Sequence, residues 1–95
     1  MDNFHKLTHF SLVICRHPIT GMYLAVDESK DRGWWVPGGG VDNGESFDDG
    51  AKRECIEEAG VDIILKGIIN ITCTSLKMRV IYYAEPADIY NCTPK

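Results

Sequence analysis

Three glutamates, Glu54, Glu57 and Glu58, lie within five consecutive positions of the chain. Residues three and four apart on a helix are neighbours, and like charges at that spacing repel one another. A helix that only faced solvent would favour interleaved lysines. Hard divalent cations take carboxylate oxygens as ligands, so a cluster of this kind is typical of a metal site. The spacing therefore predicts a small negative site that binds a divalent cation.

The helix that carries these acids is predicted over Phe47–Ala59. Ser46 is a good N-cap, and Asp48 and Asp49 favour the positive end of the helix dipole. Gly60 suits the left-handed position that ends a helix.

A helical wheel places the acids on and beside the apolar side of the helix, which is unusual for carboxylates. At about 100° per residue, four small or apolar side chains form one stripe that should pack against the protein: Phe47, Ala51, Cys55 and Ala59. Glu58 falls on this stripe, and Glu54 and Glu57 fall beside it. Carboxylates at such positions are costly unless they are paired or bind a metal.

A proline and three glycines precede the helix. Trp34-Trp35-Val36 reads as a short strand in which one ring points inward and the other outward. The run Pro37–Gly40 is expected to form no regular element, and it suits a sharp turn or a close approach to a ligand.

Residues Gly39–Val61 resemble the signature of the Nudix hydrolases, G-x5-E-x7-R-E-U-x-E-E-x-G-U, where U is a bulky aliphatic residue. The fixed positions are filled by Gly39, Glu45, Arg53, Glu54, Glu57, Glu58, Gly60 and Val61. Cys55 departs from the pattern at a U position, as a small hydrophobic residue. The resemblance implies an α/β fold, an α/β/α sandwich around a mixed sheet, with residues 1–95 as one Nudix domain.

The resemblance also implies a chemistry, the hydrolysis of a pyrophosphate linkage in a nucleoside diphosphate derivative with Mg²⁺ or Mn²⁺. By position, the metal ligands would be Glu54, Glu57, Glu58 and the carbonyl of Gly38. Arg53 and Glu45 would form a supporting salt bridge. Glu54 is the first choice for the base, and Glu57 and Arg53 complete the expected catalytic group.

Substrate contacts are expected from Gly39, Gly40, Trp35 and Arg79. Trp35 could stack on a base or belong to the core. Arg79 alternates with other polar side chains along a predicted strand and could meet phosphates, or it could belong to a row that faces solvent.

Composition narrows the class of protein. A chain of 95 residues with a net charge of −4 is at most one domain and lacks a broad basic face for nucleic acid. The four cysteines show no CxxC spacing, which favours free thiols in a reducing compartment. No apolar run is long enough to span a membrane, so a cytoplasmic protein is expected.

The flanking segments read as strands. Leu7–Arg16 is predicted to pair with Met22–Val26 as a hairpin, and 62–72 and 76–84 are predicted as two more strands with a turn near Ser75. Nudix domains usually continue further, so the domain is expected to be truncated at its C-terminus. An incomplete sheet leaves an unpaired edge, which predicts a homodimer. The alternative function is a non-catalytic Nudix module that binds a nucleotide or a protein partner.

Overall fold

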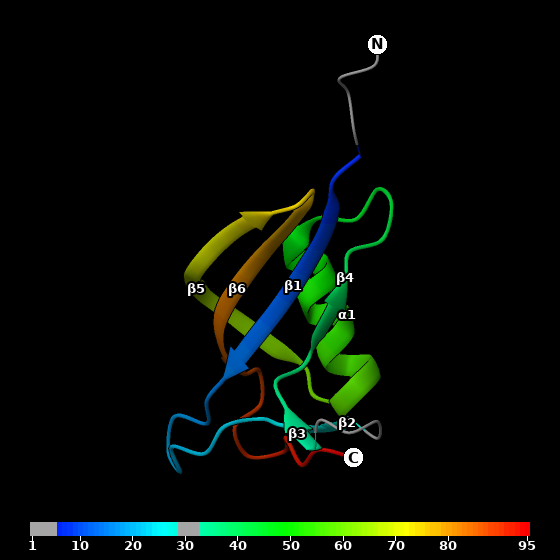
Figure 1. Ribbon diagram of the computed structural model, residues 1–95. Helices are drawn as coiled ribbons and strands as arrows, with labels where there is room; N and C mark the ends of the chain where they lie inside the picture. The colour runs from blue at the N-terminus through cyan, green and yellow to red at the C-terminus, as the bar shows by residue number, and fades with distance from the viewer. Residues whose placement is uncertain (1–5, 29–32) are drawn as a thin grey trace.

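The computed structural model of the protein describes residues 6–28 and 33–95 (Figure 1). Its elements follow the order β1 (Thr8–Cys15), β2 (Val26–Glu28), β3 (Gly33–Trp35), β4 (Gly38–Gly40), α1 (Phe47–Ala59), β5 (Ile63–Thr74) and β6 (Lys77–Pro86). No helix within the described ranges is long and apolar enough to cross a membrane. The prediction of one domain over residues 1–95 stays a prediction.

Four strands form a mixed sheet in the order β4-β1-β6-β5. The central strands β1 and β6 are parallel, with Ser11 opposite Val80 and Val13 opposite Tyr82, and the outer pairs are antiparallel. The predicted α/β class with a mixed sheet is therefore confirmed. Ser75 and Leu76 have positive φ angles of 46° and 61° and form the turn between β5 and β6, where a turn was predicted.

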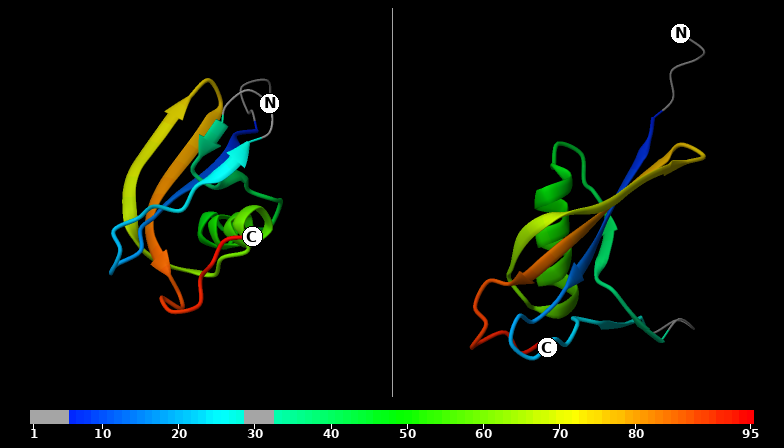
Figure 2. Two further views of the ribbon diagram at one scale, coloured as in Figure 1. Left: turned by 90° about the horizontal axis from the view of Figure 1, so that it is seen from below. Right: turned by 90° about the vertical axis from the view of Figure 1, so that its left-hand side faces the viewer.

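One face of the sheet packs against α1 (Figure 2). Strand side chains point alternately to the two faces of a sheet, and along β1 and β6 every second residue is buried. The core that results joins strand and helix residues: Val13, Cys15, Val80, Tyr82 and Ala84 with Ala51, Cys55 and Ala59. Between residues 6–28 and 33–95, α1 is the one helix, so it supplies the helical layer that positions the acids.

Helix α1 has the bounds and caps that its sequence predicts. The Ser46 hydroxyl accepts a hydrogen bond from the Asp49 amide at 3.0 Å. Gly60 adopts the left-handed conformation with φ 68°, and its amide donates to the carbonyls of Cys55 and Ile56 in the last turn of the helix. The small residues Ala51, Cys55 and Ala59 are buried, as the wheel predicts, while Phe47 is half-buried.

The prediction that Pro37–Gly40 forms no regular element is wrong. Gly38–Gly40 is strand β4, which pairs antiparallel with β1 and places Gly38 opposite Leu12. A Cβ atom on Gly38 would collide with the carbonyl oxygen of Ser11. The glycines therefore allow close approach to another strand of the protein itself, which the composition of the run could not distinguish from approach to a ligand.

The predicted hairpin of Leu7–Arg16 with Met22–Val26 is also wrong. Strand β1 already has β4 on one edge and β6 on the other, so it has no edge left for a hairpin partner. Only an isolated bridge between Arg16 and Tyr23 remains. The chain continues to β2, which pairs with β3 in a separate two-stranded ribbon.

Candidate active site

Of the three glutamates of α1, Glu54 and Glu58 lie against β4, and Glu57 is open to solvent. The side chain of Glu54 is only 14% exposed, while that of Glu57 is 57% exposed. Glu58 is half-buried, and its Oε1 accepts a hydrogen bond from the Gly38 amide at 2.8 Å. The acids thus differ in their surroundings, with Glu54 largely covered, Glu58 bonded to β4 and Glu57 open to solvent.

Arg53 ties this row to the loop before the helix. Its Nε and Nη2 donate to the two carboxylate oxygens of Glu45 at 2.9 and 3.1 Å, which is a bidentate ion pair. Its Nη1 donates to Glu54 and to Glu57, each at 3.1 Å. Its Nη2 also donates to the Gly40 carbonyl at 2.9 Å. One guanidinium therefore fixes the orientation of three carboxylates and the end of β4.

Gly39 forms a wall of the site. A Cβ atom at this position would lie 2.7 Å from Oε1 of Glu54 and 2.8 Å from its carboxyl carbon. A side chain at this position would push the Glu54 carboxylate away from β4. Gly40 differs, because a Cβ there would meet nothing within 4 Å.

The electrostatics of the acids follow from these contacts. Burial raises the pKa of Glu54, Arg53 partly offsets this rise, and the nearby charges of Glu58 and Glu57 add to it. The hydrogen bonds from Arg53 lower the pKa of Glu45 below its ordinary value. A cation bound beside Glu54 would relieve the repulsion among its neighbours, so the site favours positive charge.

The donor chemistry fits a hard divalent cation, because carboxylate oxygens on one helix face a strand whose carbonyls are also oxygen donors. Among residues 6–28 and 33–95, no three acids, histidines or cysteines already converge on one point. The contacts give the reason. Arg53 holds Glu54 and Glu57 by the same nitrogen, and the Gly38 amide holds Glu58. Each of these contacts uses one oxygen of a carboxylate, and the second oxygen of each is the atom that an ion would bind.

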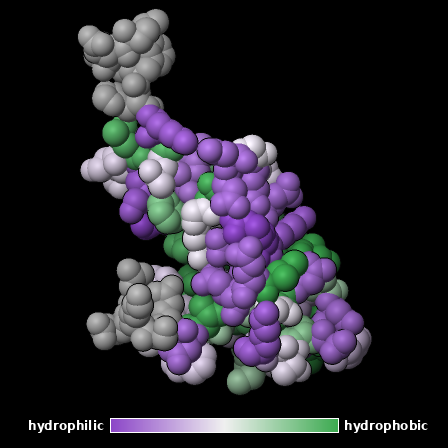
Figure 3. All heavy atoms as spheres, turned by 90° about the vertical axis from the view of Figure 1, so that its right-hand side faces the viewer, coloured by the Kyte–Doolittle hydropathy of each residue, from purple (hydrophilic) through white to green (hydrophobic). Residues whose placement is uncertain are grey.

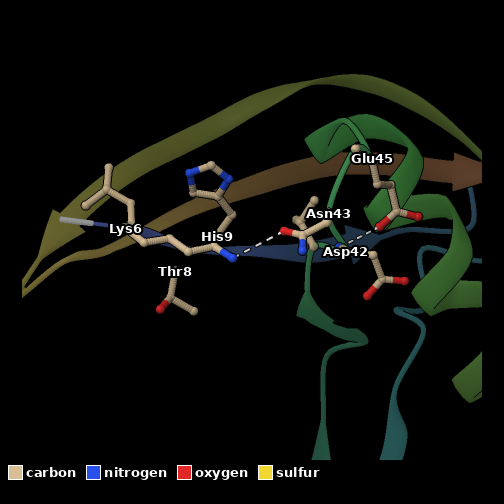
Figure 4. A pocket seen from close by; sticks show the side chains of 9 residues that line it. Lys6, Thr8, His9, Asp42, Asn43 and Glu45 are labelled. Carbon is tan, nitrogen blue, oxygen red and sulfur yellow. Dashed lines mark hydrogen bonds between the residues drawn. The ribbon is translucent and has the colours of Figure 1, made fainter. Parts of the chain in front are cut away.

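A hollow of about 850 Å³ lies before the start of α1 and is lined in part by Lys6, His9, Asn43 and Glu45. Figure 4 shows these side chains. The amine of Lys6 donates to the Asn43 side chain at 3.4 Å, and the His9 ring lies 4.9 Å from the ring of Phe47. Sequence reasoning did not select these residues, since His9 and Asn43 belong to no spaced pattern. Glu45 lines this hollow and also pairs with Arg53.

The structure does not bring Arg79 to the acids. Arg79 is exposed on β6, and its neighbour Val80 is buried in the core shared with α1. Because successive strand residues point to opposite faces, Arg79 lies on the sheet face away from the helix.

The prediction that one tryptophan ring points inward and one outward is wrong. Trp34 is 71% exposed and Trp35 is 50% exposed. Both lie on β3, which belongs to the ribbon with β2 and not to the main sheet that packs against α1. Of the two, Trp34 lines a hollow together with Glu58, and Trp35 does not. Sequence reasoning chose Trp35, because the register of β2 and β3 cannot be read from the residues alone.

The surface around the site is polar. The face that carries α1 and the loop before it is covered largely by hydrophilic side chains (Figure 3). This surface agrees with a site for a charged, hydrated ligand rather than for an apolar one.

Comparison with known proteins gives a consistent result. The family model of the NUDIX domain matches residues 7–86. Nucleoside triphosphatase NudI of Escherichia fergusonii is 42% identical over 76 residues, which cover 74% of this chain and 54% of that protein.

Two solved structures share the fold. A putative Nudix hydrolase family member from Chromobacterium violaceum superposes with a TM-score of 0.71 at 22% identity, covering 97% of this chain and 57% of that one. An ADP-ribose pyrophosphatase from Streptococcus suis superposes with a TM-score of 0.69 at 22% identity, covering 85% of this chain and 61% of that one. The chain thus spans about half the length of the curated relative NudI. With the domain match over most of its length and a signature helix packed on a mixed sheet, the chain belongs to the Nudix family.

Proposed function

We propose that the protein hydrolyses a pyrophosphate linkage in a nucleoside diphosphate derivative and that it requires a divalent metal ion. The observation that carries this proposal is the row of Glu54, Glu57 and Glu58 on α1, of which Arg53 holds the first two and the Gly38 amide of β4 holds the third. Three carboxylates at one packed face have no structural need for one another, because they repel. A bound cation and an anionic substrate would explain why the three carboxylates lie together.

The three glutamates and the Gly38 carbonyl would hold Mg²⁺ or Mn²⁺. When bound, such an ion neutralises pyrophosphate oxygens and lowers the pKa of an attacking water. Glu54 is the proposed base, because its side chain is only 14% exposed and lies against β4. Gly39 and Gly40 leave room beside it for phosphate oxygens.

Arg53 and Glu45 position the acids rather than react. The bidentate pair fixes the guanidinium, and the guanidinium in turn orients Glu54 and Glu57. Such supporting contacts commonly change metal affinity or activity 10- to 100-fold when removed, by order of magnitude.

The proposed substrate class draws on the relatives. One is named a nucleoside triphosphatase and another an ADP-ribose pyrophosphatase. Both names describe a nucleoside joined to linked phosphates. We propose the same class for this chain, whose acids would handle the linked phosphates common to both.

The test is phosphate or nucleoside monophosphate release from a panel of such compounds with Mg²⁺, comparing the wild-type protein with Glu57→Gln. Turnover should fall at least about tenfold, because a ligand should matter no less than its supporting residues. Glu85→Gln is the matched control, since Glu85 lies on β6 and pairs with Lys66. Calorimetric titration with Mn²⁺ provides a second readout. Equal turnover and equal Mn²⁺ binding in wild type and Glu57→Gln would refute the metal site.

A non-catalytic module that binds a nucleotide or a protein partner is the second candidate, since the three acids already have protein partners in Arg53 and the Gly38 amide. In that case nucleotide would bind without turnover of any compound in the panel. Calorimetry with the same nucleotides distinguishes the two functions.

We also propose that two copies pair through the free edge of β5. This strand ends the sheet and carries four isoleucines that are about half exposed: Ile64, Ile68, Ile69 and Ile71. Its one charged residue, Lys66, already faces Glu85 at 3.7 Å. Such an edge is a template for another strand. Ile71→Lys should shift sedimentation toward the monomer, whereas Ile56→Lys on α1 should not, and a wild-type monomer at high concentration would disprove the pairing.

The proposed compartment is the cytoplasm, because all four cysteines are free thiols. Localisation of a fluorescent fusion outside the cytoplasm would contradict this assignment.

A further inference from the structure

A second hollow, of about 670 Å³, lies beside the acidic row. Its lining includes Trp34, Asp27 and Glu58, and the buried side chains of Val26 and Ala59 also border it. The volume falls in the range of about 300–1,000 Å³ that is usual for small-molecule sites. One of its walls is therefore a proposed metal ligand, and another is an exposed indole ring.

The register of the ribbon places the two tryptophan side chains on opposite faces. Asp27 pairs directly with Trp34, and Val26 pairs with Trp35. Directly opposed residues of an antiparallel pair have their side chains on the same face of the sheet. Asp27 and Trp34 thus share one face of the β2–β3 ribbon, and Val26 and Trp35 share the other. Residues of both faces border the hollow, but of the two tryptophans Trp34 lines it and Trp35 does not.

The hollow is lined by groups of the kinds that bind a nucleoside. An indole offers a flat surface on which a base can stack, and stacking tolerates any base because every base has a π face. The Asp27 carboxylate can only accept hydrogen bonds, so it suits ribose hydroxyls or an amino group of the base. Glu58 connects the hollow to the acids, where the linked phosphates would lie.

We propose that this hollow is the nucleoside subsite, that the base stacks on Trp34, and that Asp27 accepts hydrogen bonds from the same nucleoside. The inference rests on the proposed hydrolysis for the position of the phosphates. It moves the stacking role from Trp35 to Trp34, on the opposite face of the ribbon. The hollow beside Lys6 and His9 would then receive the group on the other side of the pyrophosphate linkage.

The chain allows a direct spectroscopic test, because Trp34 and Trp35 are its only tryptophans. Trp35→Phe leaves Trp34 as the one indole, and Trp34→Phe leaves Trp35. Each variant is titrated with AMP and with ribose 5-phosphate, which lacks the base, in the presence of Mg²⁺. AMP should quench Trp34 emission, ribose 5-phosphate should not, and neither should change Trp35 emission.

Kinetics give an independent readout. Trp34→Leu should raise KM for the hydrolysed nucleotide about 5- to 150-fold with little change in kcat, as expected for loss of one base-stacking contact. Trp34→Phe should restore most of the affinity, because a phenyl ring still stacks. Trp35→Leu is the matched control and should leave KM within about twofold.

The outcomes separate this inference from the proposed function. Hydrolysis without AMP quenching of Trp34, and with unchanged KM in Trp34→Leu, would overturn the subsite and leave the hydrolase intact. Quenching of Trp34 by AMP without any turnover would support the subsite and refute the hydrolase. Equal quenching by AMP and ribose 5-phosphate would also overturn the subsite, since the base would then contribute nothing.

Discussion

Replacing Gly39 by alanine would put a methyl group against the carboxylate of Glu54. The new Cβ would lie 2.7 Å from Oε1, whereas ordinary contact begins at 3.4 Å. Glu54 must therefore retreat by roughly 0.7 Å, and displacements near 1 Å at a reacting group cost about 100-fold in rate. We expect kcat/KM to fall about 10- to 100-fold and Mn²⁺ to bind more weakly.

Gly67→Ala is the control for this change. Gly67 lies on β5, has no positive φ angle, and a Cβ there meets nothing within 4 Å. Gly67→Ala should keep wild-type activity and gain about 0.4–1 kcal/mol of unfolding free energy, because alanine restricts the unfolded chain.

The assay for both variants is substrate hydrolysis together with Mn²⁺ calorimetry, with urea unfolding to confirm that each variant folds. The Mn²⁺ titration compares the metal affinity of the variants even where turnover is too slow for their rates to be compared. Identical activity and identical Mn²⁺ affinity in the two variants would refute the reasoning that β4 positions Glu54.

Three further predictions concern stability and reactivity. Ser46→Ala removes the N-cap of α1 and should cost about 1 kcal/mol in urea unfolding, whereas Ser46→Asp should cost much less. Tyr82→Phe removes the hydroxyl that donates to the Asp48 carboxylate and should cost about 1–2 kcal/mol by the same method; no loss would show that the bond is not stabilising. Burial raises the pKa of Cys55 to about 12, so near pH 8 its thiol stays protonated, and the exposed Cys73 should react first with a thiol reagent. Cys73→Ser should remove that fast phase.

Much of the acidic site could be predicted from the sequence because its geometry is local. The spacing of Glu54, Glu57 and Glu58 fixes their angles on a helix, whatever the rest of the chain does. The cap at Ser46 and the end at Gly60 are likewise set by neighbouring residues, and both appear at the predicted positions. The pairing of Arg53 with Glu45 spans only eight residues and formed part of the family resemblance.

What faces the acids was decided by the tertiary structure. The glycine run looked like a turn, but it became a strand because β1 offers it an edge. The same occupation of both edges of β1 excluded the predicted hairpin and left β2 to pair with β3. In the folded chain Trp34, rather than Trp35, lines the hollow beside Glu58. Strand pairing depends on which distant edges are free, and a one-residue change of register exchanges the two faces of a strand. The local sequence around Glu54, Glu57 and Glu58 therefore indicates which kind of ligand they can bind, while long-range strand pairing decides which other side chains complete the site.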